Sequence, residues 1–359
     1  MLVMETVNRK YRLLVYTTQM LPTGGIESHL RQFLCHMENI NGISIDLVVL
    51  HSEQMDEQVK YLNSLSRKAL IGRRKITTVF KLLLFLISNR WTKYDALYTN
   101  GQGDSVYWIG KIFRFKRWIH HHHTSGDLDD QATWTAKYTK ALTGADEVIA
   151  CSTKNARDIA AKLEREVISV PCFSTDMSFK KRVNVGKLCF GYYGRLIPEK
   201  GIDLICKLSE DKELSHIQFL IWGEGEQYPQ EYFDNFSNLI YRGTFRGKEE
   251  LGRVLETLDA YLLLSTHPEG LPISLLELMS AGIPWVATNK GGISDIANDP
   301  LSTRLIRDVS DYEEIKRVIL SLADDLIGQK IDGNKQINLY QTYFSPMVLT
   351  EKWVKVLFE

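Results

Sequence analysis

The stretch that decides the fold, residues 258–295, reads LDAYLLLSTHPEGLPISLLELMSAGIPWVATNKGGISD. Tyr261 to Leu264 is a continuous apolar run, which is typical of a strand buried on both faces of a parallel sheet. Pro272 suits the start of a helix and Gly282 suits its end, so we expect a helix of about ten residues between them. The run from Ile283 to Thr288 predicts a second strand. Such a unit directs unpaired backbone N–H groups toward the crevice above the sheet, where an anion binds well.

Two glutamates frame the start of this predicted helix. Glu269 lies in the loop before it, and Glu277 lies eight positions later, within it. An ionised carboxylate accepts hydrogen bonds from sugar hydroxyls, so both residues are candidate sugar ligands. The alternative interpretation is that Glu269 caps the helix and Glu277 is a solvated residue on its surface.

The residues around these glutamates resemble the donor-site signature of family 4 retaining glycosyltransferases. The resemblance implies a GT-B fold, that is, an α/β protein with two Rossmann-like doubly wound domains facing each other across a cleft. It implies that Glu269 orients the transferred sugar of a nucleotide diphosphate sugar and that Glu277 binds the ribose. The signature residues that it assigns to the donor site in this stretch are Glu269, Gly270, Leu271, Pro272 and Glu277.

A second candidate phosphate site follows the strand predicted from Leu188 to Gly194. Arg195 and Lys200 stand five positions apart in the loop that leads to the next helix. A guanidinium and an ammonium group stabilise the negative charge of a departing diphosphate without a metal ion, although two solvated cations are the simpler interpretation. The sequence Gly-Arg-x-x-x-x-Lys-Gly also resembles the phosphate clamp of the same family. Gly223, in the turn after the next strand, is similar to another donor-site glycine of that family.

Gly24 and Gly25 follow a short strand predicted over Leu13 to Thr17. Glycine lets the backbone approach a ligand closely, and a structural turn before a helix is the simpler interpretation. The resemblance adds that the family has a Gly-Gly-x-Glu element here. The resemblance implies that these glycines bind the donor diphosphate or the acceptor.

Four consecutive histidines, residues 120–123, end another predicted strand. Adjacent side chains of a strand point to opposite faces, so four in a row cannot share one ion, and we expect no metal site. The His-Thr-Ser sequence that starts at His123 is similar to the active-site histidine of the family. It implies that His123, with His122 as second choice, hydrogen-bonds a sugar hydroxyl in its neutral form.

The length of 359 residues suits two domains, because each has enough residues for a core of its own. Predicted strands and helices alternate on both sides of a polar stretch that has no periodicity. This pattern predicts two doubly wound sheets, one before the stretch and one after it. We therefore expect an acceptor-binding domain over residues 1–175, a linker over 176–187, a donor-binding domain over 188–345, and a C-terminal helix over 346–359 that crosses back to the first domain.

The net charge is zero, but residues 60–117 contain 13 basic and 2 acidic residues. This excess indicates a solvated basic face or a surface for anionic lipid head groups. The apolar run from Val79 to Ile87 is expected to pack mainly into the core, with lysines that snorkel to solvent. No run is long enough to span a bilayer and no secretion signal is evident, so we expect a cytoplasmic protein, peripheral at the inner face of the membrane. The five cysteines are expected to be reduced core thiols.

Together these features predict a metal-independent retaining glycosyltransferase that uses no cofactor and does not bind nucleic acid. It would move a sugar from a UDP- or GDP-linked donor to a glycan or lipid-linked glycan in surface polysaccharide synthesis, with His123, Arg195, Lys200 and Glu269 as catalytic residues. One alternative is a non-catalytic subunit of the same fold that binds a sugar nucleotide or glycan. A nicotinamide-dependent oxidoreductase is disfavoured, because Gly24 and Gly25 lack a third glycine at the required spacing.

Overall fold

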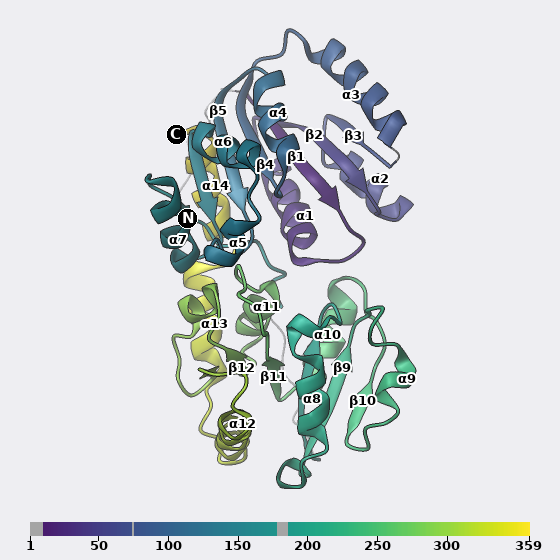
Figure 1. The fold of residues 1–359 in the computed structure, drawn as a ribbon, viewed down its shortest axis with the longest axis vertical. Helices are drawn as coiled ribbons and strands as arrows, with labels where there is room; N and C mark the ends of the chain where they lie inside the picture. Colours follow the sequence, from purple (N-terminus) through teal and green to yellow (C-terminus); the bar gives the residue numbers. More distant parts are fainter. Residues whose placement is uncertain (1–9, 74, 178–185) are drawn as a thin grey trace. The chain divides into compact units, whose positions relative to one another are not determined.

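The computed structural model describes residues 10–73, 75–177 and 186–359, and the chain forms two compact units (Figure 1). The first unit is Met1–Phe173 with Pro346–Glu359, and the second is Ser174–Ser345. Each unit is built on a parallel sheet with helices, which confirms the expected α/β class. Most of the expected linker, residues 178–185, lies outside the described residues.

The first unit contains a seven-stranded parallel sheet in the order β3-β2-β1-β4-β5-β6-β7. Its strands are β1 (Tyr11–Met20), β2 (Ile43–Ser52), β3 (Lys68–Ile71), β4 (Tyr94–Asn100), β5 (Phe115–His122), β6 (Glu147–Ala150) and β7 (Ile168–Ser169). Its helices are α1 (Gly25–Glu38), α2 (Asp56–Ser64), α3 (Lys75–Asn89), α4 (Asp104–Ile112), α5 (Leu128–Ala132), α6 (Ala136–Gly144), α7 (Thr153–Leu163) and α14 (Pro346–Phe358).

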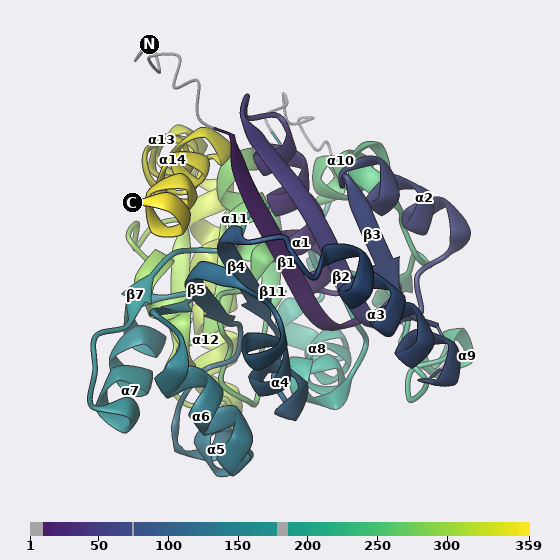
Figure 2. The ribbon, with the colours of Figure 1, turned by 90° about the horizontal axis from the view of Figure 1, so that it is seen from above.

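Successive side chains of β1 point to opposite faces of this sheet and pack into two separate hydrophobic cores. Leu13 and Val15 join the core that contains side chains of α1 and α14, whereas Leu14 and Tyr16 join the core that contains side chains of α4, α6 and α7. Trp353 of α14 is fully buried in the first of these cores. The C-terminal helix is therefore part of the first unit, whose strands β1, β2 and β3 are seen side by side in Figure 2.

The second unit contains a six-stranded parallel sheet in the order β10-β9-β8-β11-β12-β13. Its strands are β8 (Leu188–Tyr193), β9 (Ile217–Trp222), β10 (Leu239–Tyr241), β11 (Ala260–Leu263), β12 (Trp285–Thr288) and β13 (Thr303–Ile306). Its helices are α8 (Ile202–Ser209), α9 (Gln230–Phe233), α10 (Gly247–Thr257), α11 (Ile273–Ala281), α12 (Tyr312–Ile327) and α13 (Gly333–Tyr343), with the 3-10 turns η1 (Pro198–Lys200), η2 (Lys212–Leu214) and η3 (Gly292–Ile296).

The central strand–loop–helix–strand unit forms as the sequence predicts. β11 is fully buried, α11 begins directly after Pro272, and Gly282 ends it in the left-handed conformation with φ 69°. A Cβ atom on Gly282 would come within 2.9 Å of the Gly333 carbonyl oxygen at the start of α13. Glycine is therefore required here both by the backbone conformation and by the close packing of α13.

Candidate functional site

The loops at the carboxyl ends of β8 and β9 contact each other through their backbones. The N–H of Gly194 donates to the carbonyl of Trp222 at 3.2 Å. A Cβ on Gly223, whose φ is 135°, would lie only 1.9 Å from the Gly194 carbonyl oxygen. Gly194, the glycine of the predicted phosphate clamp, and Gly223 are thus adjacent at the carboxyl ends of two neighbouring strands.

Lys200, which is partly buried, and Glu269, which is buried, form an ion pair. Lys200 ends the turn η1 after β8, whereas Glu269 lies in the loop after β11, and their Nζ and Oε1 atoms are 2.5 Å apart. The N–H of Thr266 donates to the carbonyl of Glu199 at 2.9 Å, which fixes the two loops together. Ser265 donates its hydroxyl to the same carboxylate oxygen. Two signature residues that are 69 positions apart therefore meet at one point.

The electrostatic balance at Glu269 favours its charged form. Burial acts to raise the pKa of this carboxyl, but the Lys200 ammonium and the Ser265 hydroxyl outweigh it, and the pKa is lowered. At neutral pH Glu269 is therefore a carboxylate. The carboxylate has a second oxygen with which to accept a hydrogen bond from a sugar hydroxyl.

The first turn of α11 has no side-chain cap among the described residues, so Glu269 does not cap this helix. Its N-terminal position is Pro272, and Leu271 before it is buried. The Glu269 backbone is held by Gly292, whose N–H donates to the Glu269 carbonyl at 3.0 Å. A Cβ on Gly291 would collide with that carbonyl oxygen at 1.9 Å. The loop that contains Glu269 and Gly270 is thus fixed in front of the positive end of a helix.

Glu277 is buried with only 7% of its surface exposed, which rules out the solvated helix surface considered above. The Tyr193 hydroxyl lies 3.1 Å from one of its carboxylate oxygens. Burial raises the pKa of Glu277 to about 7, and the hydrogen bonds from Tyr193 and Thr175 only partly oppose it. Sequence reasoning missed Tyr193, although a tyrosine at the end of a buried strand needs a partner for its hydroxyl.

Arg195 differs from Lys200, the other predicted cation of the donor site, because the side chain of Arg195 is exposed. The Tyr192 hydroxyl donates to the Arg195 carbonyl at 2.9 Å, which fixes the backbone and leaves the guanidinium outside the fold. Among the residues that the structure describes, no carboxylate forms an ion pair with Arg195. The N–H groups of its guanidinium therefore remain available to donate hydrogen bonds to an anion.

The predicted residues of the first unit lie at the carboxyl ends of its own strands. Gly24, with φ 155°, precedes α1, and Gly25 is the first residue of that helix. The Glu27 carboxylate accepts a hydrogen bond from the Leu21 N–H at 2.9 Å and lies over Gly24, where a Cβ would be 2.2 Å from its Oε2. A carboxylate from the first turn of α1 therefore lies close to the glycine backbone that precedes this helix.

The structure distinguishes His122 from His123. His122 is buried, with Nδ1 2.8 Å from the Tyr138 hydroxyl and Nε2 2.7 Å from the Asp130 carboxylate, so both ring nitrogens have partners. The Nε2 atom of His123 is buried with no hydrogen-bond partner within the described part of the chain. Of the two candidates, His123 retains the capacity to donate or accept a further hydrogen bond.

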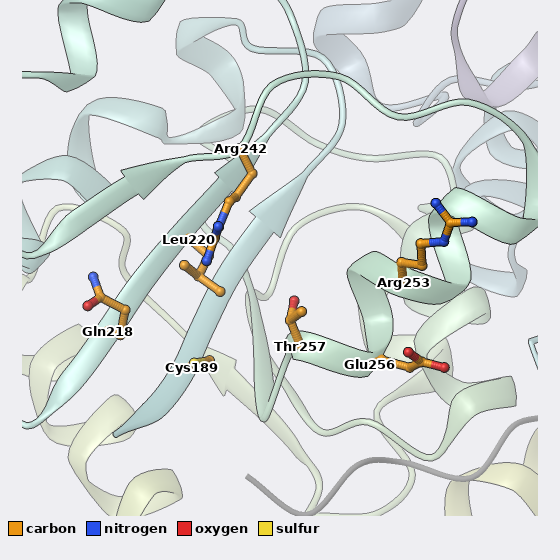
Figure 3. Close-up of a pocket in the computed structure, with 7 residues that line it drawn as sticks. All are labelled: Cys189, Gln218, Leu220, Arg242, Arg253, Glu256 and Thr257. Atoms are coloured by element: carbon orange, nitrogen blue, oxygen red, sulfur yellow. The ribbon is translucent and has the colours of Figure 1, made fainter. Parts of the chain in front are cut away.

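A separate cavity of about 600 Å³ in the second unit is drawn in Figure 3. Cys189 and Gln218, which line it, are paired neighbours near the amino ends of β8 and β9. Substrates of open parallel sheets bind at the carboxyl ends of the strands, so we do not assign the donor to this cavity. Arg253 and Glu256 of α10 also line it.

Parts of the chain are similar in sequence to known glycosyltransferases. Residues 173–331 match the family model of glycosyl transferases group 1. An uncharacterized glycosyltransferase of Methanocaldococcus jannaschii is 25% identical over 97% of this chain and 98% of the relative. A 2-deoxystreptamine N-acetyl-D-glucosaminyltransferase of Niallia circulans is 28% identical, over 40% of this chain and 38% of the relative.

Two solved structures have a similar fold. Anabaena HepE, solved with UDP and glucose, superposes with a TM-score of 0.73 at 14% identity, over 96% of this chain and 98% of HepE. A variant of S. aureus TarM, solved with UDP, fondaparinux and α-GlcNAc-glycerol, gives a TM-score of 0.75 at 15% identity, over 96% and 99% of the two chains. The chain therefore has the fold of the GT-B glycosyltransferases, and its second unit matches the sequence pattern of the group 1 glycosyl transferases.

Proposed function

We propose that the protein is a retaining glycosyltransferase whose second unit binds a nucleotide diphosphate sugar, UDP- or GDP-linked, and whose first unit binds the acceptor. The observation that carries this proposal is the Lys200–Glu269 ion pair, whose carboxylate lies in the loop that leads into α11; the first turn of that helix has no side-chain cap among the described residues. It combines a fixed cation, a helix dipole and a sugar-binding carboxylate at the carboxyl edge of one sheet. The match to the group 1 family and the UDP found in HepE and TarM support the assignment.

The proposed reaction is a front-face displacement. The bond between the anomeric carbon and the β-phosphate oxygen breaks, the acceptor oxygen bonds to the same face of that carbon, and the acceptor proton passes to the departing phosphate. Arg195, Lys200 and the first N–H groups of α11 stabilise the charge that develops on the β-phosphate. Glu269 orients the transferred sugar, and His123 hydrogen-bonds one of its hydroxyls near the reacting carbon. Because these cations take the place of a divalent ion, initial rates are expected to be the same with and without added Mg²⁺ or Mn²⁺.

The test begins with a thermal-shift screen of UDP, GDP and their sugars, because a bound ligand raises the melting temperature by mass action. The donors that bind are then incubated with glycan and lipid-linked acceptors, and released nucleoside diphosphate is measured. We expect release that requires both substrates. Binding without release for every pair of donor and acceptor would favour the non-catalytic subunit. The absence of any nucleotide binding would contradict the transferase and leave only a glycan-binding subunit.

Glu277 makes donor binding dependent on pH. In the free protein its pKa is about 7, and two ribose hydroxyls that donate to the carboxylate would lower that pKa in the complex. Binding then releases a proton, so affinity rises about tenfold per pH unit below pH 7 and levels off above it. Calorimetry with an intact nucleotide sugar between pH 5.5 and 8.5 measures this, since its diphosphate diester does not titrate in that range.

The matched control for this pH dependence is Glu277→Gln, which keeps the shape and cannot ionise. We expect flat affinity across the range and weaker binding than wild type at pH 8. The same substitution should raise the melting temperature at pH 8 more than at pH 5, because a carboxyl whose pKa is raised by folding loses stability as pH rises through about 7. The ribose role of Glu277 would be wrong if both proteins showed the same pH profile.

We also propose that α3 docks on an anionic membrane, which suits a lipid-linked acceptor. The expectation that the run from Val79 to Ile87 packs mainly into the core is wrong for most of its side chains. Phe85 is buried there, whereas an apolar row along the helix is exposed: Ile76 86%, Phe80 63%, Leu83 53%, Ile87 57% and, just past the helix, Trp91 79%. Figure 1 shows α3 at the surface of the first unit.

The spacing of this row follows one face of a helix, and Lys81 and Arg90 are exposed beside it. No helix among the described residues is long and apolar enough to cross a membrane. An apolar face flanked by basic residues is the arrangement of helices that lie in the plane of the lipid interface. The basic stretch of residues 60–117 therefore includes a helix with an exposed apolar row.

Vesicle co-sedimentation tests this docking. Wild type is expected to pellet with vesicles that contain phosphatidylglycerol, and less as salt rises. The triple variant Phe80→Gln, Leu83→Gln and Ile87→Gln should lose at least about tenfold in membrane affinity, because each apolar side chain contributes about 1.5–3 kcal/mol when buried. Leu128→Gln, which changes an even more exposed leucine outside α3, is the control. Equal pelleting of the triple variant and wild type would contradict the role of α3.

A further inference from the structure

Two histidines and two cysteines from separate strand ends converge at the carboxyl edge of the first unit's sheet. His121 is in β5 and His123 follows that strand, Cys151 comes directly after β6, and Cys172 lies beyond β7. His121 and His123 are two positions apart in an extended chain and so share a face, whereas His120 and His122 point to the other side, toward Tyr138. His121 and His123 can therefore contact the same ion, whereas two adjacent histidines of the strand cannot.

The ligand atoms of these four residues already lie at the corners of a small polyhedron, all within 4.8 Å of one another. The two thiol sulfurs are 3.5 Å apart, and the Cys151 sulfur is 3.4 Å from Nε2 of His121. Nδ1 of His123 is 3.7 Å from the Cys151 sulfur and 3.6 Å from the Cys172 sulfur. A tetrahedral zinc ion with ordinary bond lengths requires sulfur–sulfur edges of about 3.8 Å and sulfur–nitrogen edges of about 3.6 Å.

We propose that His121, His123, Cys151 and Cys172 form a closed, structural Zn²⁺ site. The cluster contains two thiols and two imidazoles and no carboxylate, which is the ligand set that zinc prefers over Mg²⁺, Ca²⁺ or Mn²⁺. His121, Cys151 and Cys172 are buried, with 4% or less of their surface exposed. Because the protein supplies all four ligands, no position is left open for a water or a substrate.

The surrounding hydrogen bonds match the second shell of a metal site. The N–H of Phe173 donates to Nδ1 of His29 at 2.9 Å, so neutral His29 holds its proton on Nε2, which is 3.1 Å from the Tyr98 hydroxyl. Both nitrogens of His29 are thereby used, and it is not a ligand. The same Tyr98 hydroxyl lies 2.9 Å from Nδ1 of His121. It can accept the proton that Nδ1 must carry when Nε2 of His121 binds the ion.

Zinc binding would also fix which ring nitrogen of His123 carries the proton. With Nδ1 on the metal, its proton is on Nε2, the atom that lacks a partner among the described residues. Metal binding releases the two thiol protons, since zinc is bound by thiolates. The ion would join the carboxyl ends of β5 and β6 to the segment after β7. It does not enter the proposed transfer reaction, for which the cations lie in the second unit.

Metal analysis and cobalt substitution test the site in the full-length protein. Protein from zinc-supplemented medium is expected to retain one zinc per chain after desalting against a weak chelator. Exchange for Co²⁺ should give the intense visible bands of a tetrahedral site with thiolate-to-cobalt charge transfer in the near ultraviolet. Cys172→Ala and His121→Ala should each lose the bound equivalent, whereas Cys35→Ala, which changes a half-buried cysteine of α1 outside the cluster, should keep it.

The cobalt spectrum of the wild-type protein shows whether the cluster binds a metal ion, even if the cluster variants fail to fold. Zinc-free protein with no tetrahedral cobalt bands would overturn the proposal and leave a hydrogen-bonded group of thiols and imidazoles. A Cys151–Cys172 disulfide, detected by peptide mass spectrometry in protein purified without oxidant, would overturn it in favour of a redox pair. None of these readouts depends on transferase activity, so the site and the proposed function fail independently.

Discussion

Replacing Arg195 with alanine is expected to lower kcat by about 100- to 1,000-fold, with a much smaller change in KM for the donor. The β-phosphate gains charge as its bond to the sugar breaks, so a guanidinium bound to it stabilises the transition state more than the ground state. Arg195 is exposed and forms no ion pair with any described residue, so its removal leaves no buried charge unpaired. The protein should therefore keep the melting temperature of wild type.

Steady-state kinetics with the donor that gives the largest thermal shift measure this effect. Arg195→Lys should recover only part of the rate, because an ammonium cannot form the paired hydrogen bonds of a guanidinium. Arg253→Ala is the matched control, since Arg253 is an exposed arginine of the same unit that lines the cavity in Figure 3. If Arg253→Ala lost as much activity as Arg195→Ala, the donor would have to be placed elsewhere in this unit.

Replacing Lys200 with methionine is expected to reduce both stability and activity. Glu269 is 7% exposed, and without the ammonium it becomes an uncompensated buried carboxylate. Such a loss costs about 3–5 kcal/mol, which for a unit of this size corresponds to roughly 10 °C in melting temperature. The rate should also fall by about 100-fold or more, because the phosphate loses a fixed cation.

The destabilisation of Lys200→Met should depend on pH with a defined sign. In wild type the pKa of Glu269 is lowered, so its pair stabilises the fold above the usual carboxyl pKa and loses that effect in acid. In the variant burial acts unopposed by Lys200 and raises that pKa, so stability should fall as pH rises. Melting temperatures of both proteins between pH 3 and 9 measure both effects, because the wild type should lose stability in acid and the variant should lose it as the pH rises.

The double variant Lys200→Met with Glu269→Gln separates stability from chemistry. Removing both charges should restore most of the melting temperature, because no buried charge is left unpaired. Activity should stay low, since neither the cation nor the sugar-orienting carboxylate is restored. Lys248→Ala, a change of an exposed lysine on α10, controls for loss of surface charge. Additive losses from the two single variants would show that the pair is not coupled.

Much of the donor site was predictable from local patterns. The apolar run of β11, Pro272 and Gly282 specify a strand, a helix start and a helix end, because each acts through short-range backbone preferences. The loop with Glu269 necessarily follows that strand. Which partner its carboxylate meets was not predictable, because Lys200 is 69 residues away and strand order in the sheet brings them together.

The sequence by itself determined the succession of strands and helices, the positions of the loops and the charges that they contain, since these depend on periodicity and on residues close in the chain. The tertiary structure alone decided which distant groups meet, because that depends on strand order and on the packing of helices over the sheet. It exposed the apolar row of α3, buried Glu277 beside Tyr193, and brought Cys151 and Cys172 to His121 and His123. Burial and proximity are properties of the folded chain, and they set the pKa, the ion pair and the ligand set on which the proposed chemistry depends.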